Sequence, residues 1–200
     1  MFTTLPEGAA YSPASVIWTT WRPYSQRPGY LGLEWLKKTE GTRLKGLEIS
    51  SDMIVLAKNN AAEYGLSERV EYYQGDAKKM PFEDGHFDAV FSNGSLHEWQ
   101  HPEMIFNEIA RVLKTGGRYL ISDLRRDMIA PARWFLWLTV KPREMRPGLI
   151  TSINASYTLP EIKAILARTE LKGWQVSQNP LGIVIYSYII IYLLVYPNSC

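Results

Sequence analysis

Residues 44–61, LKGLEISSDMIVLAKNNA, and residues 70–99, VEYYQGDAKKMPFEDGHFDAVFSNGSLHEW, decide the fold of this 200-residue chain. Together they contain short apolar runs that alternate with a helical pattern, and the run FDAVFS has the composition of a buried strand. This alternation predicts an α/β fold with a parallel sheet and crossover helices. The strands that we expect in these stretches are residues 43–49, 70–73 and 87–92.

Helix signals stand between the expected strands. Ser50 or Ser51 suits the cap of a helix over residues 52–64, which Gly65 would end. Outward from there, a short strand is predicted over residues 16–21. Further strands are predicted over residues 118–122 and 174–177 and from residue 182 onward, and helices over residues 30–38 and 102–114. The helix over residues 30–38 is expected to turn Leu31, Trp35 and Leu36 toward the core. The helix over residues 102–114 would end at Gly116 and Gly117, and its expected inner face is Ile105, Phe106, Ile109, Val112 and Leu113.

Composition argues for an ordinary globular protein rather than a nucleic-acid binder. The net charge is +2, and 46% of residues are hydrophobic. We therefore expect no nucleic-acid partner. The single cysteine, Cys200, excludes a disulfide within the chain and suits a reducing, cytoplasmic location, and residues 1–11 lack the pattern of a signal peptide.

The C-terminal stretch LGIVIYSYIIIYLLVY, Leu181 to Tyr196, is almost wholly apolar. Its 16 residues are fewer than the roughly 20 that span a bilayer as a helix, and its Ile, Val and Tyr favour strands. We therefore expect a pair of buried strands, with a membrane tail anchor as the alternative. A homodimer formed through this stretch is left open.

Acidic and small residues follow the expected strands. Glu48 ends one strand and lies 19 residues after Gly29, which suits a carboxylate that accepts hydrogen bonds from ribose hydroxyls. Asp76 follows the next strand, and Asn93-Gly94 follows the third, where small residues let a ligand approach the backbone. The alternatives are a surface glutamate at Glu48 and a turn at Asp76.

The stretch from Gly29 to Asp123 resembles the core of class I S-adenosylmethionine-dependent methyltransferases, of the methyltransferase type 11 domain group. The resemblance rests on PGYLGLEWLKK, on the two opening stretches and on IFNEIARVLKTGGRYLISD, in order and spacing. It covers about half of the chain. It implies a Rossmann-like, doubly wound, mostly parallel sheet of three-layer α/β/α architecture.

The resemblance also implies a cofactor, S-adenosyl-L-methionine, and assigns residues to it. Glu48 would bind the ribose, Asp76 the adenine amine, Ala77 would line the adenine, and Asn93 and Gly94 would lie under the methionine part. The full set of expected cofactor-binding residues is Gly29, Glu48, Ile49, Asp76, Ala77, Asn93 and Gly94.

The first loop of the family pattern is altered. Pro23 stands where the family has an acid, and Ser25 and Arg27 stand where it has glycines. Glycine allows backbone conformations that place the chain close to a ligand, so side chains here should crowd the methionine part. This departure supports an alternative function, a methyltransferase-like fold without cofactor binding that acts as a binding or scaffold protein.

His97 is the expected catalytic residue. It follows the strand over residues 87–92 and should face the methyl group, and a histidine suits a general base near neutral pH. The alternative is a histidine that only positions its loop, and Glu98 and His101 are weaker candidates. His97-Glu98-Trp99-Gln100-His101 also matches the H-E-x-x-H zinc pattern, but that pattern requires a helix and Pro102 follows directly, so we expect no metal.

The chain is expected to form one methyltransferase-like domain over residues 1–200. Residues 1–28 are an atypical N-terminal segment, residues 125–157 a substrate-side insertion and residues 181–200 the apolar C-terminal part. Within the insertion, Trp134, Asn154 and Tyr157 are candidates for binding a small-molecule methyl acceptor, although ordinary core is the favoured interpretation of its aromatic residues.

A nicotinamide-dependent oxidoreductase is not supported, because G-x-G-x-x-G is absent. A membrane partner is not favoured, with the apolar C-terminal part as the exception.

Overall fold

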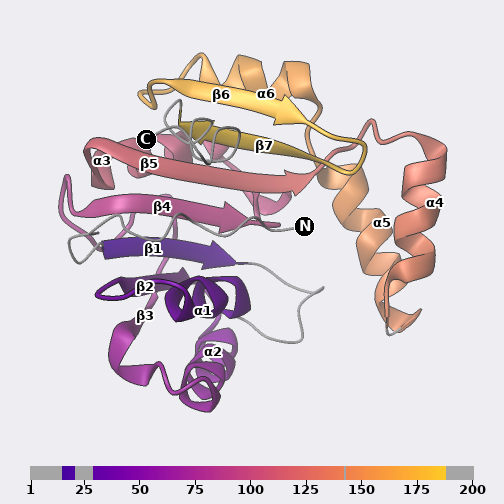
Figure 1. Ribbon diagram of the computed structural model, residues 1–200. Helices are drawn as coiled ribbons and strands as arrows, with labels where there is room; N and C mark the ends of the chain where they lie inside the picture. Colours follow the sequence, from indigo (N-terminus) through magenta and orange to yellow (C-terminus); the bar gives the residue numbers. More distant parts are fainter. Residues whose placement is uncertain (1–14, 21–28, 142, 188–200) are drawn as a thin grey trace, which may run out of the picture.

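Strands from both halves of the chain form a single sheet in the computed structural model, which describes residues 15–20, 29–141 and 143–187 (Figure 1). The strand order is β3-β2-β1-β4-β5-β7-β6. Strand β7 is antiparallel to both β5 and β6, and the other pairings are parallel. The predicted doubly wound, mostly parallel sheet is therefore confirmed. The strands are β1 (Ser15–Thr20), β2 (Arg43–Glu48), β3 (Val70–Gln74), β4 (Phe87–Asn93), β5 (Leu113–Leu124), β6 (Trp174–Gln178) and β7 (Gly182–Ser187).

Helices cover both faces of this sheet, because alternate residues of the strands point to opposite faces. On one face, Val90 of β4 joins a large buried cluster with Phe106 and Ile162 from two helices. On the other face, Leu44 of β2 packs with a helical leucine, Leu36. The architecture is thus three-layered. The helical elements are α1 (Tyr30–Lys37), α2 (Ser51–Glu63), η1 (Ser67–Arg69), η2 (Leu96–Glu98), α3 (Pro102–Val112), α4 (Ala130–Thr139), η3 (Arg143–Met145), α5 (Arg146–Ala155) and α6 (Leu159–Leu166).

Arg111 of α3 connects two segments of the sequence, MPFED and RVLK, that are far apart along the chain. Its guanidinium donates hydrogen bonds to the Phe82 carbonyl at 2.8 Å, the Met80 carbonyl at 3.1 Å and the Asp84 carboxylate at 2.7 Å. Glu108 completes the network, because it accepts from Arg111 and from the Met80 N–H. The loop MPFED is therefore fastened to the last turn of α3, where the segment RVLK begins, and this fixes the entry of the chain into β4.

Two predicted details of the helices are wrong. In α1, Leu36 is buried and Trp35 packs beside it as expected, but Leu31 is 38% exposed, and Leu33 is buried instead. Helix α3 ends at Val112 rather than at the two glycines, and Leu113 already pairs with Phe87 in the sheet. The next pair is Ala89 with Arg118, so residues 114–117 bulge out of β5 and Gly116 adopts φ 77° there.

Residues 125–157 contain a pair of helices around a small core, to which Leu124 and Leu181 from outside this segment also contribute. Met128, Leu149 and Ile153 are buried between α4 and α5, with Leu136 packed against them. Figure 1 shows the pair beyond the ends of the β4 and β5 arrows, at the carboxyl edge of the sheet. The interpretation of the aromatic residues as core is wrong for α4, because Trp134 is 64% exposed, and Phe135 and Trp137 are exposed as well, whereas Tyr157 packs against the large core.

The apolar C-terminal stretch supplies one described strand, β7, which is paired on both sides. Residues 188–196 of that stretch, and with them the second expected strand, lie outside the described residues. Among the residues that are described, no helix is long and apolar enough to cross a membrane.

Candidate functional site

The carboxyl ends of the parallel strands bring the predicted cofactor residues to one edge of the sheet (Figure 1). In the register, Glu48 of β2 pairs with Gln74 of β3, and Asn93 of β4 pairs with Thr20 of β1 and with Ser122 of β5. The strand order reverses between β1 and β4, and ligands of open α/β sheets bind at such a reversal. The predicted residues therefore border the position where a ligand is expected from topology alone.

The carboxylates of Glu48 and Asp76 each accept a hydrogen bond from a backbone N–H two residues later, which holds the local turn. The Ser50 N–H donates to Glu48 Oε1 at 3.0 Å, and the Gly75 N–H donates to the Glu48 carbonyl at 3.0 Å. Asp76 Oδ1 accepts from the Lys78 N–H at 2.9 Å, and this bond holds the pKa of the Asp76 carboxyl below its usual value. The turn expected as the alternative at Asp76 is thus present, and an exposed carboxylate still has further acceptor positions for a ligand.

Three of the predicted positions supply backbone or small side chains. Gly29 precedes α1 at φ 85°, and Gly94 follows β4 at φ 69°, conformations that favour glycine. Asn93 at the end of β4 accepts a hydrogen bond from the Ser122 hydroxyl at 2.6 Å. Of the remaining two, Ile49 is 69% exposed beside Glu48, and Ala77 packs against the large core.

His97 is held by a buried carboxylate that the sequence analysis did not assign. Its Nδ1 lies 2.9 Å from Asp123 Oδ2, and its backbone N–H donates to the same oxygen at 2.8 Å. The side chains of His97 and Asp123 are only 5% and 2% exposed. Asp123 also accepts from the Leu124 N–H at 2.7 Å, so one carboxylate joins η2, after β4, to the end of β5.

This pairing was foreseeable in part from the strand order. Asp123 lies at the end of the strand that neighbours β4, just as His97 follows β4. Parallel neighbours bring their carboxyl ends together, so an acid and a histidine after adjacent strands indicate a pair.

Glu98 has the most strongly shifted carboxyl of the candidate site. Burial raises the pKa of Glu98 from 4.5 to about 7; His97 acts in the opposite sense, and the carboxylates of Asp123 and Glu48 add repulsion. Glu98 is nevertheless an exposed residue by surface area, so solvent screens these interactions strongly. Negative charge is therefore concentrated where the ends of β2, β4 and β5 meet.

This shift makes stability depend on pH. A folded-state pKa above the unfolded value means that the folded chain binds the extra proton, so the unfolding free energy falls as pH rises from about 4.5 to about 7. Glutamine does not titrate, so we expect Glu98→Gln to remove this pH dependence. The unfolding free energy of Glu98→Gln minus that of the wild type should rise by about 1 kcal/mol between pH 5 and pH 8, after allowance for screening. Urea unfolding across that range measures it, with the surface variant Glu63→Gln as control. A pH-independent difference between Glu98→Gln and the wild type would contradict the shift.

The zinc-protease pattern does not form a zinc site. His97 and Glu98 belong to the short helix η2, and His101 only precedes the first residue of α3. The two histidines are thus not on one face of a helix, which that pattern requires. Over the described ranges, no three His, Cys, Asp or Glu side chains gather around a common point suited to a metal.

The candidate acceptor-binding residues belong to the α4–α5 segment. Trp134 is an exposed residue of α4, and Asn154 of α5 accepts a hydrogen bond from Arg133 at 2.7 Å. Tyr157 follows α5, is half-buried, and its hydroxyl donates to the Trp99 carbonyl at 3.4 Å. Tyr157 is therefore tied to the loop that follows His97.

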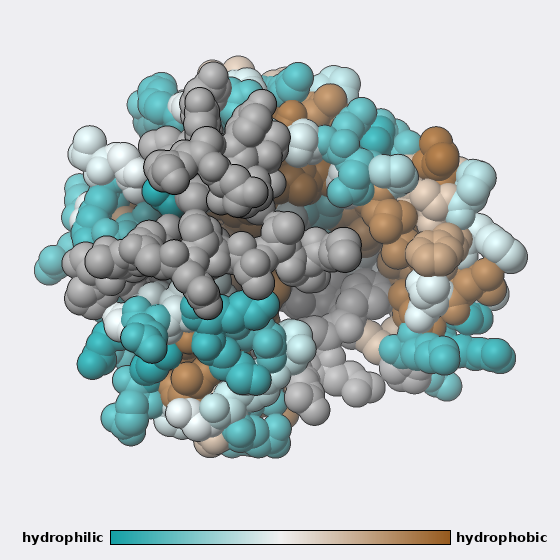
Figure 2. All heavy atoms as spheres, in the orientation of Figure 1, coloured by the Kyte–Doolittle hydropathy of each residue, from teal (hydrophilic) through white to brown (hydrophobic). Residues whose placement is uncertain are grey.

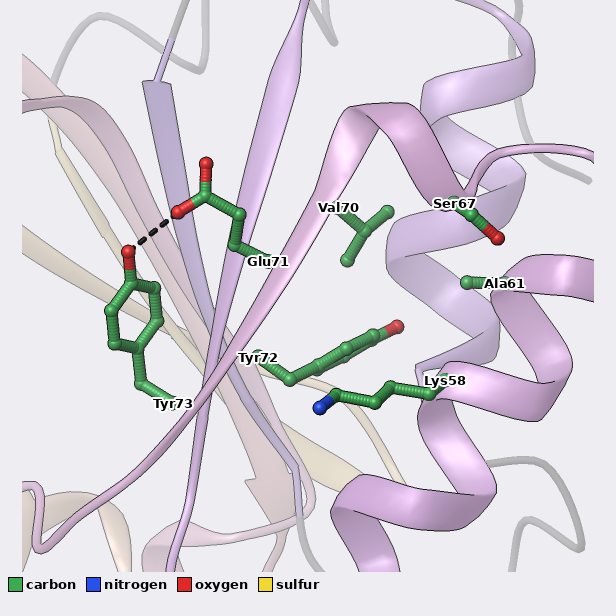
Figure 3. Close-up of a pocket in the computed structure, with 7 residues that line it drawn as sticks. All are labelled: Lys58, Ala61, Ser67, Val70, Glu71, Tyr72 and Tyr73. Carbon is green, nitrogen blue, oxygen red and sulfur yellow. Dashed lines mark hydrogen bonds between the residues drawn. The ribbon is translucent and has the colours of Figure 1, made fainter.

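A hollow of about 540 Å³ lies elsewhere, at the outer edge of the sheet. Figure 3 shows Tyr72 of β3 projecting toward α2, beside Lys58, whereas Glu71 and Tyr73 project away from that helix. Burial raises the pKa of Tyr72 to about 12. The seven lining residues include none of the residues predicted for the cofactor, the acceptor or catalysis, so this hollow is not the candidate site.

Comparison with known sequences identifies the domain. The family described as a methyltransferase domain matches residues 29–121. The fatty-acid O-methyltransferase of Mycolicibacterium smegmatis is 36% identical over 100 residues, which are 50% of this chain and 35% of that protein. The ubiquinone/menaquinone biosynthesis C-methyltransferase UbiE of Pseudomonas savastanoi is 35% identical over 79 residues, 40% of this chain and 31% of that protein. The chain thus spans about a third of the length of these relatives.

Comparison of folds extends over more of the chain. A S-adenosylmethionine-dependent methyltransferase from Aquifex aeolicus superposes with a TM-score of 0.63 at 18% identity, covering 88% of this chain and 81% of the other. This likeness concerns the fold, and the sequence match supplies the family. Residues 29–121 of this chain therefore belong to the methyltransferase domain family, on the fold of the class I S-adenosylmethionine-dependent methyltransferases.

Proposed function

We propose that this chain transfers a methyl group from S-adenosylmethionine to a small, largely apolar acceptor. The observation that carries the proposal is the position of Glu48, an acid at the end of β2 beside the reversal of strand order. The relatives support the acceptor class, because their names specify a fatty acid in one case and a quinone pathway in the other.

The residues at the carboxyl edge fit this cofactor by charge and by size. Glu48 and Asp76 are acceptors suited to a ribose diol and an exocyclic amine, and Gly94 leaves the end of β4 open to close approach. The repulsion that Glu48 and Asp123 exert on Glu98 would be relieved by a positively charged ligand. A sulfonium cofactor carries such a charge.

S-adenosylmethionine supplies the activated methyl group when it is bound, and the protein supplies binding and orientation. Glu48 and Asp76 bind the nucleoside in this proposal, and the α4–α5 segment borders the acceptor. His97 removes the acceptor proton, where there is one, and Asp123 is its positioning residue through Nδ1. Holding the acceptor in line with the methyl group provides much of the rate in such a transfer.

The alternative is a methyltransferase-like fold that no longer binds the cofactor and acts as a binding or scaffold protein. It is favoured by Pro23, Ser25 and Arg27 in the first loop, which lies outside the described residues. Cofactor binding separates the two functions.

Calorimetric titration of the purified chain with S-adenosylmethionine and S-adenosylhomocysteine tests the proposal. We expect micromolar binding, and at least a tenfold loss in Glu48→Ala, since hydrogen bonds to a charged group contribute about 1.5–3 kcal/mol. Glu68→Ala, an exposed glutamate on η1, is the matched control and should bind as the wild type does. No binding by a chain that circular dichroism shows to be folded would favour the scaffold function instead.

A further inference from the structure

The outward face of α4 is an apolar surface on the outside of the protein. Its inward residues, Ala132 and Leu136, pack against the small core of the helical pair. Figure 2 shows hydrophobic residues gathered over the end of the molecule that carries α4 and α5. The helix is therefore apolar on both sides, which an isolated surface helix is not. The exposed residues in and next to the helix are Ile129 (62%), Trp134 (64%), Phe135 (56%), Trp137 (37%) and Leu138 (40%).

Basic residues border this face. Residues 129–146 contain four basic residues and one acidic residue, in a chain whose net charge is only +2. Arg133 donates to the Asn154 amide oxygen, and Arg146 donates to the Leu138 carbonyl and stacks over Trp137 at 4.0 Å. These partners are neutral, so the bonds orient the two arginines without compensating their charge. Lys141 and Arg143 are exposed beside them.

This combination of aromatic and basic residues fits an anionic lipid surface. Tryptophan is favoured where apolar tails meet polar headgroups, and lysine and arginine near such a surface are attracted by acidic lipids. A second copy of the chain fits less well, because a two-fold interface would bring the same positive border against itself. The 10 residues of α4 are about 15 Å long, which suits a helix lying in the plane of the interface.

The face is also connected to the candidate site. Helix α5 contacts α4 on one side and η2, which carries His97, on the other. An interface at α4 would therefore set the carboxyl edge of the sheet close to the membrane surface. We propose that the outward face of α4, with Lys141 and Arg143, docks on bilayers that contain acidic phospholipid.

Sedimentation of the full chain with sucrose-loaded vesicles tests this proposal. Vesicles of phosphatidylcholine alone are compared with vesicles that contain phosphatidylglycerol as well, at low and at high salt. We expect binding to the acidic vesicles that weakens at high salt, and at least a tenfold loss in Phe135→Ser/Leu138→Ser. The matched control is Val55→Ser/Leu56→Ser, two adjacent residues of α2 with 57% and 48% exposure, which should bind like the wild type. Lys141→Gln/Arg143→Gln should weaken binding to acidic vesicles about fivefold per charge.

Absence of binding to acidic vesicles, or equal losses in the two apolar double variants, would overturn the proposal. Sedimentation equilibrium without lipid decides whether a second copy covers the face: a dimer that dissociates in Phe135→Ser/Leu138→Ser would also overturn it. The result does not depend on cofactor binding, so a chain that binds vesicles but not S-adenosylmethionine would refute the proposed function and leave this docking surface standing.

Discussion

Asp123→Ala is expected to lower the unfolding free energy by about 3–5 kcal/mol. The carboxylate is 2% exposed and accepts hydrogen bonds from His97 Nδ1, from the His97 backbone N–H and from the Leu124 N–H. Alanine removes the acceptor for all three groups while they stay away from water, and each unpaired buried polar group costs about 1–3 kcal/mol. The loop that carries His97 would also lose its attachment to β5.

Urea unfolding at pH 7 measures this loss. Asp127→Ala is the matched control, because Asp127 forms a salt bridge with Arg125 at 2.7 Å but keeps 43% of its side chain exposed. An exposed pair of this kind contributes at most about 1 kcal/mol. Asp123→Asn, which keeps one acceptor oxygen, should lie between the two. Similar small losses in all three variants would mean that Asp123 does not anchor η2.

The sequence predicted the strands near the site well because their patterns are local. Arg43–Glu48 and Phe87–Asn93 lie within a residue of the expected bounds, and Ser50 caps α2 with a bond from the Met53 N–H. Because a parallel sheet aligns its carboxyl ends, correct strand ends were sufficient to bring Glu48 and Asn93 to one edge. Their roles toward the cofactor stay predictions.

The features that the sequence did not predict depend on contacts between distant residues. Asp123 was predicted only as the last residue of the stretch that resembles the methyltransferase family, because its bond to His97 spans 26 positions and depends on the β4–β5 pairing. The end of α3 was misplaced because a glycine pair is typical of a helix end, whereas here Gly116 belongs to a bulge within β5.

The aromatic residues of α4 were misassigned for a different reason. Composition favours the interior for Trp134 and Phe135, and only the tertiary structure shows which face of the helix is covered. Leu136, directly after Phe135, packs inward instead. The same amino-acid composition is thus compatible with a buried core and with an exposed docking surface, and only the packing of the helix distinguishes them.

Phe106→Ala is expected to cost about 3–5 kcal/mol of the unfolding free energy, out of a typical total of about 5–15 kcal/mol. Phe106 is 0% exposed on α3, and its ring meets that of Trp99 edge-on at 5.3 Å. It belongs to the buried cluster that joins α3 and α6 to the sheet, so alanine would leave a cavity that rigid strands cannot close. The loss should therefore approach the upper part of the range.

Met104→Ala on the same helix is the control that separates packing from helix propensity. Met104 is 50% exposed two positions before Phe106, and methionine and alanine differ little in helix propensity, so we expect a change within about 0.5 kcal/mol. Urea unfolding followed by far-ultraviolet circular dichroism measures both variants. If Phe106→Ala does not fold, Phe106→Leu is expected to retain the fold at a cost of about 1–1.5 kcal/mol, because much of the volume is kept. Equal losses at positions 104 and 106 would contradict the packing of α3 on the sheet, and with it the rigid support of the strand ends on which the candidate site depends.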